Sequence, residues 1–209
     1  LHPRVRRQRQ MCIRDRIKAM NKGHSSLTSW GLEHMNIERT ATVLDIGCGG
    51  GKTVDRLCSI VANGKVYGID YSELSVKSSE KLNSKNILCN KAKILQASVS
   101  DMPFDDNTFD NITAVETYYF WPDKENDVKE VFRVLKQGGT VMLLFEMLRT
   151  DDDPFKWEKV ENMLNIKSVT PQEIRAVLES AGFENINTYT KEGTTWLCAT
   201  AQKPKDDEN

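Results

Sequence analysis

A stretch from Val43 to Gly51, Val-Leu-Asp-Ile-Gly-Cys-Gly-Gly-Gly, constrains the fold of this chain more than any other feature. Its apolar residues suit a buried parallel strand, and the glycines that follow precede an amphipathic segment. Glycine has no Cβ, so the backbone can turn sharply there and approach a ligand closely. Asp45, Gly47, Gly49 and Gly51 fall on alternate positions, and this pattern predicts a loop that binds a nucleotide-type cofactor.

Two better-known glycine loops do not fit this spacing. A phosphate-binding P-loop needs four residues between its first glycine and Gly-Lys-Thr, and Gly47 is one residue too close to Gly51. The dinucleotide fingerprint needs a third glycine where this chain has Lys52, which argues against a nicotinamide cofactor. Lys52 and Thr53 are then residues of a first helical turn. A glycine-rich turn without a ligand is the remaining alternative.

A second apolar run, residues 65–70, ends in Asp70, which lies 19 residues after Gly51. At about this distance a Rossmann-type sheet presents a carboxylate to the ribose hydroxyls of its cofactor. Asp70 also precedes Tyr71-Ser-Glu73 and is a candidate for a helix N-terminal or turn residue. The joint spacing of the glycines and the carboxylate favours the cofactor interpretation.

The rest of the chain alternates strand and helix patterns. Val128, Val131, Phe132 and Leu135 form the stripe of a helix that we expect to end at Gly138-Gly139. Ser72 is predicted to cap one helix, and Thr170 another as part of a capping box with Pro171 and Glu173. Further strands are predicted at residues 92–98, 111–116, 140–147, 186–190 and 195–202. Such alternation predicts an α/β fold with a mainly parallel sheet, helices on both faces, and an antiparallel hairpin at the C-terminal edge.

Charge and composition narrow the function classes. The net charge is −1, but residues 1–16 carry six arginines against one acid, which leaves −6 on residues 17–209. An acidic body offers no basic stripe for nucleic acid. The five cysteines are scattered and odd in number, which suggests a reducing cytoplasm. The three histidines form no ligand cluster and no apolar run approaches a membrane span, so neither a metal nor a membrane is indicated.

The glycine pattern resembles the first motif of the class I S-adenosylmethionine (SAM) dependent methyltransferases. Within that family the chain looks most like the UbiE-like type, whose loop G-D-A-x-x-L-P-F-x-x-x-x-F-D is matched here by Ala97 to Phe104 and by Phe109-Asp110. The resemblance covers residues 41–203 and implies a seven-stranded Rossmann-like sheet. It also predicts a capping helix region at residues 17–40. From their own composition, residues 1–16 are expected to be a non-native or disordered basic segment, and residues 204–209 are expected to be a disordered tail.

The resemblance implies site residues position by position. Those expected to bind SAM are Asp45, Gly47, Cys48, Gly49, Gly51, Asp70, Tyr71, Ser98, Val99 and Glu116. Ser98 replaces the acid that accepts a hydrogen bond from adenine in the family, and a neutral hydroxyl makes a weaker bond, so modest cofactor affinity is expected. Val99 keeps the position whose backbone N–H meets the ring.

The resemblance says less about which residues bind the acceptor. Glu116 is a candidate to bind the methionine amine, orient the acceptor or act as a base. Tyr118, Tyr119 and Trp121 are candidate walls of a substrate pocket, with core packing the alternative. His24, near the expected cap, is a second candidate base, and a structural or exposed histidine is its alternative.

The expected function is transfer of a methyl group from SAM to a small-molecule acceptor by in-line displacement, in a cytoplasmic monomer or homodimer. A protein side chain is the alternative acceptor. The rival from another class is a catalytically inactive SAM-binding protein that acts as a sensor or partner subunit, and Ser98 is the feature that favours it.

Overall fold

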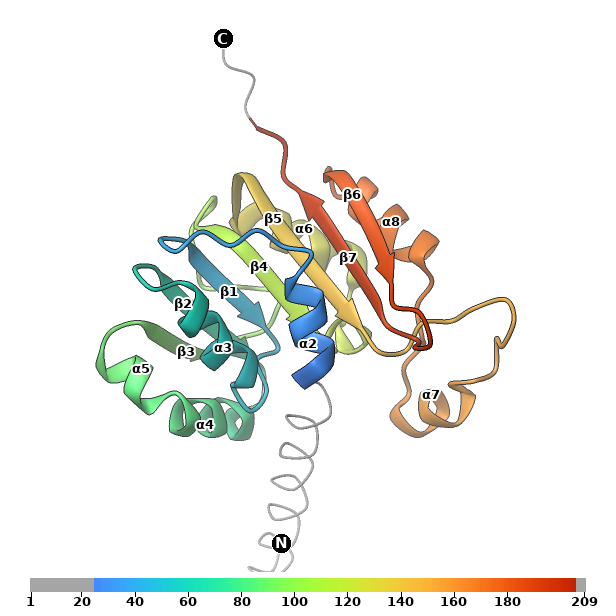
Figure 1. Ribbon diagram of the computed structural model, residues 1–209, viewed down its shortest axis with the longest axis horizontal. Coiled ribbons are helices and arrows are strands. Elements are labelled where there is room, and N and C mark those ends of the chain that lie inside the picture. Colours follow the sequence, from blue (N-terminus) through green and yellow to red (C-terminus); the bar gives the residue numbers. More distant parts are fainter. Residues whose placement is uncertain (1–24, 206–209) are drawn as a thin grey trace, which may run out of the picture.

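The computed structural model describes residues 25–205, which form a sheet covered on both faces by helices (Figure 1). The seven strands lie in the order β3-β2-β1-β4-β5-β7-β6. Strands β1 to β5 run parallel, whereas β7 is antiparallel to both β5 and β6. The predicted fold class is therefore confirmed. The strands are β1 (Thr42–Ile46), β2 (Lys65–Asp70), β3 (Ala92–Gln96), β4 (Phe109–Val115), β5 (Leu135–Phe145), β6 (Glu184–Thr190) and β7 (Leu197–Gln202).

Helices bury their apolar stripes on the two faces of the sheet. Figure 1 shows α2 and α3 in front of the sheet and α6 and α8 behind it. Val54 and Leu57 of α3 pack in one core cluster, and Val128 and Val131 of α6 pack in another. The helices are α2 (Ser25–Leu32), α3 (Lys52–Ile60), α4 (Glu73–Leu82), α5 (Ser84–Leu88), α6 (Lys124–Val134), α7 (Glu158–Leu164) and α8 (Pro171–Ser180), with a 3₁₀ turn, η1, at Tyr118–Phe120.

Side-chain caps start three of these helices. The Ser72 hydroxyl accepts a hydrogen bond from the Ser75 N–H at the start of α4, as predicted. Asp123 accepts one from the Asn126 N–H at the start of α6. Thr170 and Glu173 form the predicted capping box of α8, with Pro171 at its first position.

The structure corrects the predicted boundary between α6 and β5. The helix ends at Val134, and β5 already begins at Leu135, so Gly138 and Gly139 lie inside a strand and do not end the helix. Gly138 has a positive φ of 72°, and the register against β4 shifts at this point. A Cβ on Gly139 would lie 3.0 Å from the Asp110 carbonyl oxygen, so the glycines serve a strand irregularity that brings two backbones close together.

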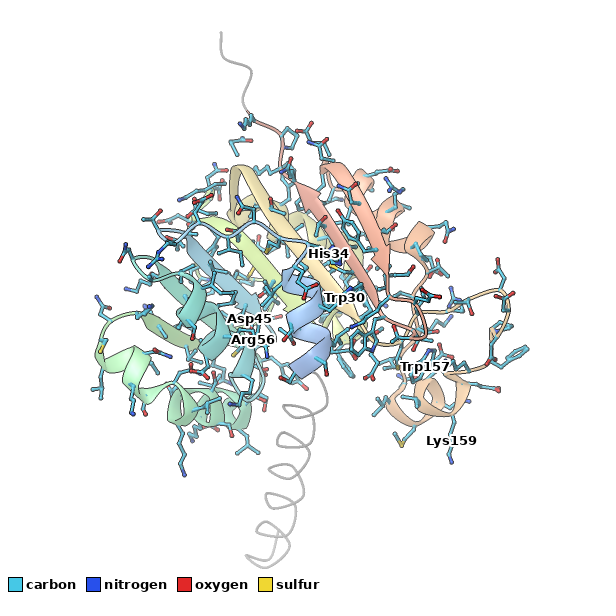
Figure 2. The ribbon with its side chains drawn as sticks, viewed as in Figure 1. Trp30, His34, Asp45, Arg56, Trp157 and Lys159 are labelled. Atoms are coloured by element: carbon cyan, nitrogen blue, oxygen red, sulfur yellow. The ribbon has the colours of Figure 1, made fainter. Side chains whose placement is uncertain are left out.

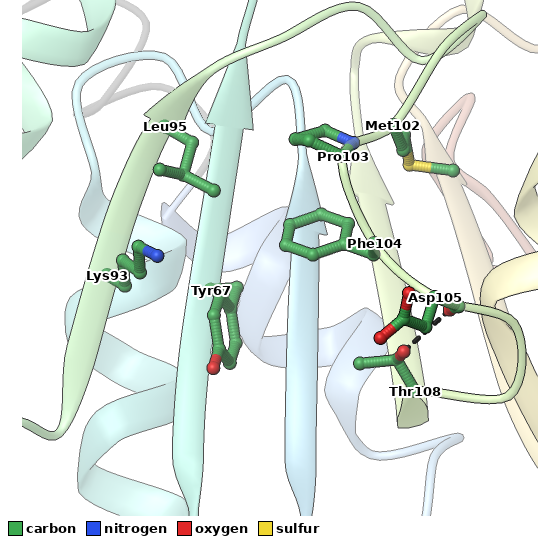
Figure 3. Close-up of a pocket in the computed structure, with 8 residues that line it drawn as sticks. All are labelled: Tyr67, Lys93, Leu95, Met102, Pro103, Phe104, Asp105 and Thr108. Atoms are coloured by element: carbon green, nitrogen blue, oxygen red, sulfur yellow. Dashed lines mark hydrogen bonds between the residues drawn. The ribbon is translucent and has the colours of Figure 1, made fainter.

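Several other predicted boundaries move by about two residues: β5 ends at Phe145, β6 begins at Glu184 and β7 begins at Leu197. Strand β3 ends at Gln96 instead of residue 98, and β4 begins at Phe109 instead of residue 111. The loop between β3 and β4 contains no helix. Instead, the ring of Phe104 packs edge-to-face with the rings of Tyr67 and Phe109. A pocket of about 450 Å³ lies beside Phe104 on the face of β2 and β3, away from the glycine loop (Figure 3).

The strand order places a topological switch point between β1 and β4. The chain moves outward from β1 through β2 to β3 and then returns to the other side of β1 as β4. In open α/β sheets the ligand site lies at the carboxyl ends of the strands at such a point. This geometry selects the carboxyl edge of the sheet as the candidate site.

Only some of the predicted domain boundaries lie within the described residues. Residues 1–16, residues 17–24 of the predicted cap and residues 206–209 lie outside the described residues. The extent of the domain as residues 41–203 stays a prediction. Between residues 25 and 205 no helix is both long and apolar enough to cross a membrane.

Candidate active site

The three alternate glycines after β1 all adopt positive φ angles, 67° at Gly47, 51° at Gly49 and 82° at Gly51. A Cβ on Gly47 would lie 2.1 Å from the Thr117 hydroxyl oxygen, and one on Gly51 would lie 2.4 Å from the Ser79 hydroxyl oxygen. Gly49 differs, because the nearest atom to its added Cβ is 3.9 Å away. Two glycines are therefore needed for packing inside the protein, and the middle one leaves an open backbone surface for a ligand.

Cys48 contributes its backbone to this loop, while its side chain is buried. Its N–H donates to the Ile69 carbonyl oxygen at 2.9 Å, which ties the loop to the end of β2. The thiol lies 3.8 Å from the Ser79 hydroxyl, and burial raises the pKa of Cys48 well above its ordinary value. A protonated, buried thiol is not a nucleophile.

Asp70 lies at the carboxyl end of β2, beside the glycine loop. One carboxylate oxygen accepts from the Gly49 N–H at 2.9 Å, and the other accepts from the Ser72 N–H at 2.9 Å. Burial raises the pKa of Asp70 above its ordinary value, and these hydrogen bonds oppose that rise. Each carboxylate oxygen has two acceptor positions, so both can still accept from a pair of ribose hydroxyls.

Asp45 is buried near the end of β1, with 2% of its surface exposed. The Thr113 hydroxyl donates to its Oδ1 at 2.8 Å from the facing position on β4. Burial raises the pKa of Asp45 to about 7, and the nearby charge of Asp70 adds to the rise. Sequence reasoning missed Thr113, although a threonine inside the otherwise apolar strand from Ile112 to Val115 is a visible signal.

The loop after β3 brings two further predicted residues to this edge. The Ser98 hydroxyl accepts from the Ser100 N–H at 3.2 Å, whereas the side chain of Val99 is buried. Tyr71 follows Asp70 directly and is 77% exposed. The ends of β1, β2 and β3 thus gather the predicted cofactor residues, and we call this region the cofactor half of the site.

Glu116 follows β4 and adopts a left-handed backbone conformation, with φ of 57°. Such a conformation is strained for a residue with a Cβ, and strain of this kind concentrates at functional sites. The Glu116 Oε1 atom accepts from the Glu146 N–H and lies 3.4 Å from the Tyr119 hydroxyl. Burial raises the pKa of Glu116 to about 8, and the charge of Glu146 adds to the rise. Glu146, at the end of β5, was not identified from the sequence.

The three predicted aromatic walls are buried against the core. Tyr118 and Tyr119 are each 5% exposed, and both rings meet Phe145 edge-on. Trp121 is 6% exposed and packs against Tyr118. Only Tyr119 has a clear polar link to the site, since its hydroxyl oxygen also accepts from the Met147 N–H at 3.0 Å. Their role as pocket walls stays a prediction, and His24 lies outside the described residues.

Comparison with known proteins agrees with this geometry. Residues 44–143 match the model of a methyltransferase domain family. The chain is 27% identical over 183 residues to the uncharacterized methyltransferase YdaC of Bacillus subtilis (strain 168), covering 87% of this chain and 93% of that relative. It is 31% identical to the ubiquinone/menaquinone biosynthesis C-methyltransferase UbiE of Cronobacter sakazakii, covering 75% of this chain and 72% of the relative. A SAM dependent methyltransferase from Aquifex aeolicus superposes with a TM-score of 0.70 at 22% identity, over 90% of this chain and 96% of that one.

The switch point, the open glycine loop and the buried carboxylates define an α/β protein that binds a nucleotide-type cofactor. The chain belongs to the class I SAM-dependent methyltransferases, and its cofactor is accordingly S-adenosylmethionine.

The residues present fit this cofactor. Gly49 offers bare backbone where the ligand passes, and Asp70 holds a carboxylate beside it. Between residues 25 and 205, no group of three His, Cys, Asp or Glu side chains is placed to hold a metal ion.

Proposed function

We propose that this protein transfers the methyl group of SAM to a small-molecule acceptor by in-line displacement. The observation that carries the proposal is the cofactor half of the site, where Asp70 and Gly49 are joined by a hydrogen bond at the carboxyl edge. The segment between β5 and α8 holds one seven-residue helix, α7, which leaves little room for a domain that would grip a macromolecule. Names of relatives add support, since UbiE is a C-methyltransferase of quinone biosynthesis.

Each predicted cofactor residue has a role in this proposal. Asp70 accepts from the ribose hydroxyls, and Tyr71 lies beside it with an exposed ring. Ser98 and the Val99 N–H face the adenine edge. Asp45 and the loop of Gly47, Cys48, Gly49 and Gly51 hold the methionine part.

The chemistry needs little from the protein beyond positioning. Bound SAM supplies an electrophilic methyl group on a sulfonium, which is already a good leaving group. The protein holds the acceptor nucleophile in line with that bond and excludes water, and orientation of this kind is worth about 7–11 kcal/mol. Glu116 binds the amine of the methionine part, orients the acceptor or takes up its proton. His24 stays a second candidate base.

Radiolabel transfer tests the proposal. The full chain is incubated with SAM labelled on its methyl group and with fractionated cell extracts, and label is counted separately in the small-molecule and protein fractions. Label in the small-molecule fraction is the expected result. Label confined to protein would contradict the small-molecule acceptor.

One alternative rests on Ser98, which stands where the family has an acid. In that case the protein binds SAM without turnover and acts as a sensor or partner subunit. Binding of SAM with no label transferred to any fraction would favour this alternative. A Ser98→Asp variant sharpens the test, because an acid at this position is expected to raise cofactor affinity.

A further inference from the structure

The carboxyl ends of β4 and β5 and the start of the antiparallel strand β7 form the other half of the site, which we call the acceptor half. Because the cofactor residues gather on β1 to β3, the reacting methyl group has to face this half. Phe145 pairs with Leu197, so Glu146 at the end of β5 lies beside Trp196 at the start of β7. The pairing continues past the strands, since the Leu148 N–H donates to the Thr195 carbonyl oxygen at 3.0 Å.

Two partly exposed tryptophans meet at this edge on the α2 face of the sheet. The rings of Trp30, from α2, and Trp196 lie 5.9 Å apart between centroids, with 45° between their planes. His34 supports Trp30 edge-on at 5.1 Å and stacks on Tyr189 at 4.0 Å. Figure 2 shows Trp30 and His34 near the C-terminal end of α2, on the side toward β7. These rings are held in place by their packing against one another.

A cation already lies over one of these rings. The ammonium nitrogen of Lys191, in the β6–β7 turn, is 4.8 Å from the centroid of Trp196. The face of an indole attracts cations within about 6 Å of its centroid. Lys191 is exposed, so its side chain can leave the ring at low cost and give its place to another cation.

Two acidic side chains lie at the same edge. Glu116 and Glu146 follow adjacent parallel strands, and the carboxylate of Glu116 is bound by the backbone N–H of Glu146. No ion pair joins Glu116 to a lysine or arginine among residues 25–205. Aromatic faces are the surroundings that recognise organic cations in proteins, and the two acids follow strands of the same edge.

We propose that Trp30 and Trp196 form an aromatic wall of the acceptor site and that the acceptor is an organic amine bound as its cation. This inference rests on the proposed function and deepens it. The ammonium group first gives one proton to the Glu116 carboxylate. The freed nitrogen lone pair then forms the new N–C bond with the methyl group as the C–S bond breaks. The bonding electrons stay on sulfur, giving S-adenosylhomocysteine (SAH) and a methylated ammonium product.

Binding of small cations to the SAH-loaded full chain tests this inference without requiring turnover. The probes are tetramethylammonium and 2-phenylethylamine, each compared with a neutral molecule of similar shape, tert-butanol and 2-phenylethanol. We expect each cation to bind about two- to thirtyfold more tightly than its neutral counterpart, as measured by calorimetry and tryptophan fluorescence. Trp196→Leu and Trp30→Leu should each reduce this preference.

Two further variants make the test specific. Lys191→Met removes the competing ammonium from an exposed turn and is expected to tighten cation binding severalfold without affecting the fold. Tyr67→Leu is the matched control, because Lys65 lies 5.7 Å from the centroid of that ring, far from the acceptor half. Tyr67→Leu should leave the preference for cations unchanged.

SAH binding is measured first, so that a failure of the proposed function can be distinguished from a failure of the amine inference. Absence of SAH binding would contradict the proposed function itself. Normal SAH binding with equal affinity for cations and neutral molecules would overturn only the amine inference. Unchanged cation binding in Lys191→Met would overturn it as well, even if a tryptophan variant failed to fold.

Discussion

The two halves of the site are built by different means. In the cofactor half, the geometry comes from the backbone: three glycines with positive φ, and a carboxylate that accepts two backbone N–H groups. In the acceptor half, side chains far apart in the sequence come together, such as Trp30 with Trp196, and the Glu116 carboxyl group with the backbone of Glu146. In the proposed function the first half binds the cofactor, SAM, and the second half binds the acceptor.

The largest expected effect lies in the backbone of the cofactor half. Gly51→Ala places a Cβ 2.4 Å from the Ser79 hydroxyl and 2.5 Å from the Asn83 amide nitrogen, at a φ that disfavours any side chain. We expect the free energy of unfolding to fall by about 2–5 kcal/mol, measured by urea denaturation. Gly193→Ala is the matched control, with φ of 70° and no atom within 4 Å, and it should cost only about 1–2 kcal/mol. Equal losses would show that packing around Gly51 is unimportant.

Two buried carboxyl groups, Asp45 in the cofactor half and Glu116 in the acceptor half, should determine how stability depends on pH. Burial raises the pKa of Glu116 to about 8 and that of Asp45 to about 7. Between about pH 5 and 7 the folded protein therefore holds more protons than the unfolded chain, and its free energy of unfolding should fall as pH rises. Each group contributes at most about 1.4 kcal/mol per pH unit. Acids with a lowered pKa, such as Glu130 and Glu161, lose their contribution only below this range.

Urea denaturation of the cofactor-free protein at several pH values checks this slope. Glu116→Gln should flatten it, because a neutral amide does not titrate. Glu184→Gln, an exposed change on β6, should leave it unaltered. Stability that rises from about pH 5 to 7 would show that Glu116 and Asp45 ionise normally.

Thr113→Val, at the boundary between the cofactor half and the acceptor half, is expected to have a smaller effect on stability. It removes the donor to the buried Asp45 carboxylate while it keeps the shape of the side chain. We expect a loss of about 1–3 kcal/mol in the free energy of unfolding and a further rise in the pKa of Asp45. Thr108→Val removes an exposed hydrogen bond to the Asp105 carbonyl oxygen and should cost less. A larger loss for Thr108→Val would contradict the account of Asp45.

The same contrast explains what the sequence could predict. Four residues could be predicted from the sequence because their roles depend on local backbone geometry and on short, regular spacing. They are Gly47, Gly49, Gly51 and Asp70. The capping box at Thr170 was predictable for the same reason. Strand alternation then indicated the sheet and its C-terminal hairpin.

Long-range contacts were not predictable in this way. Glu146 and Trp196 become neighbours only through the antiparallel pairing of β5 with β7, and Trp30 joins them only when α2 packs on the sheet. Gly138 was taken as a helix stop because a strand irregularity uses glycine just as a helix end does.

The most direct test of the central claim is calorimetric titration of SAH into the wild-type chain and into Asp70→Asn, with NAD and ATP as other ligands. The amide keeps the shape of the Asp70 side chain but loses the charge that strengthens its hydrogen bonds to ribose hydroxyls. Asp152→Asn, an exposed change between β5 and α7, is the matched control. We predict selective SAH binding that weakens about tenfold or more in Asp70→Asn and is unchanged in Asp152→Asn. Equal SAH affinity in all three proteins, or no SAH binding by the wild-type chain, would contradict the placement of the cofactor.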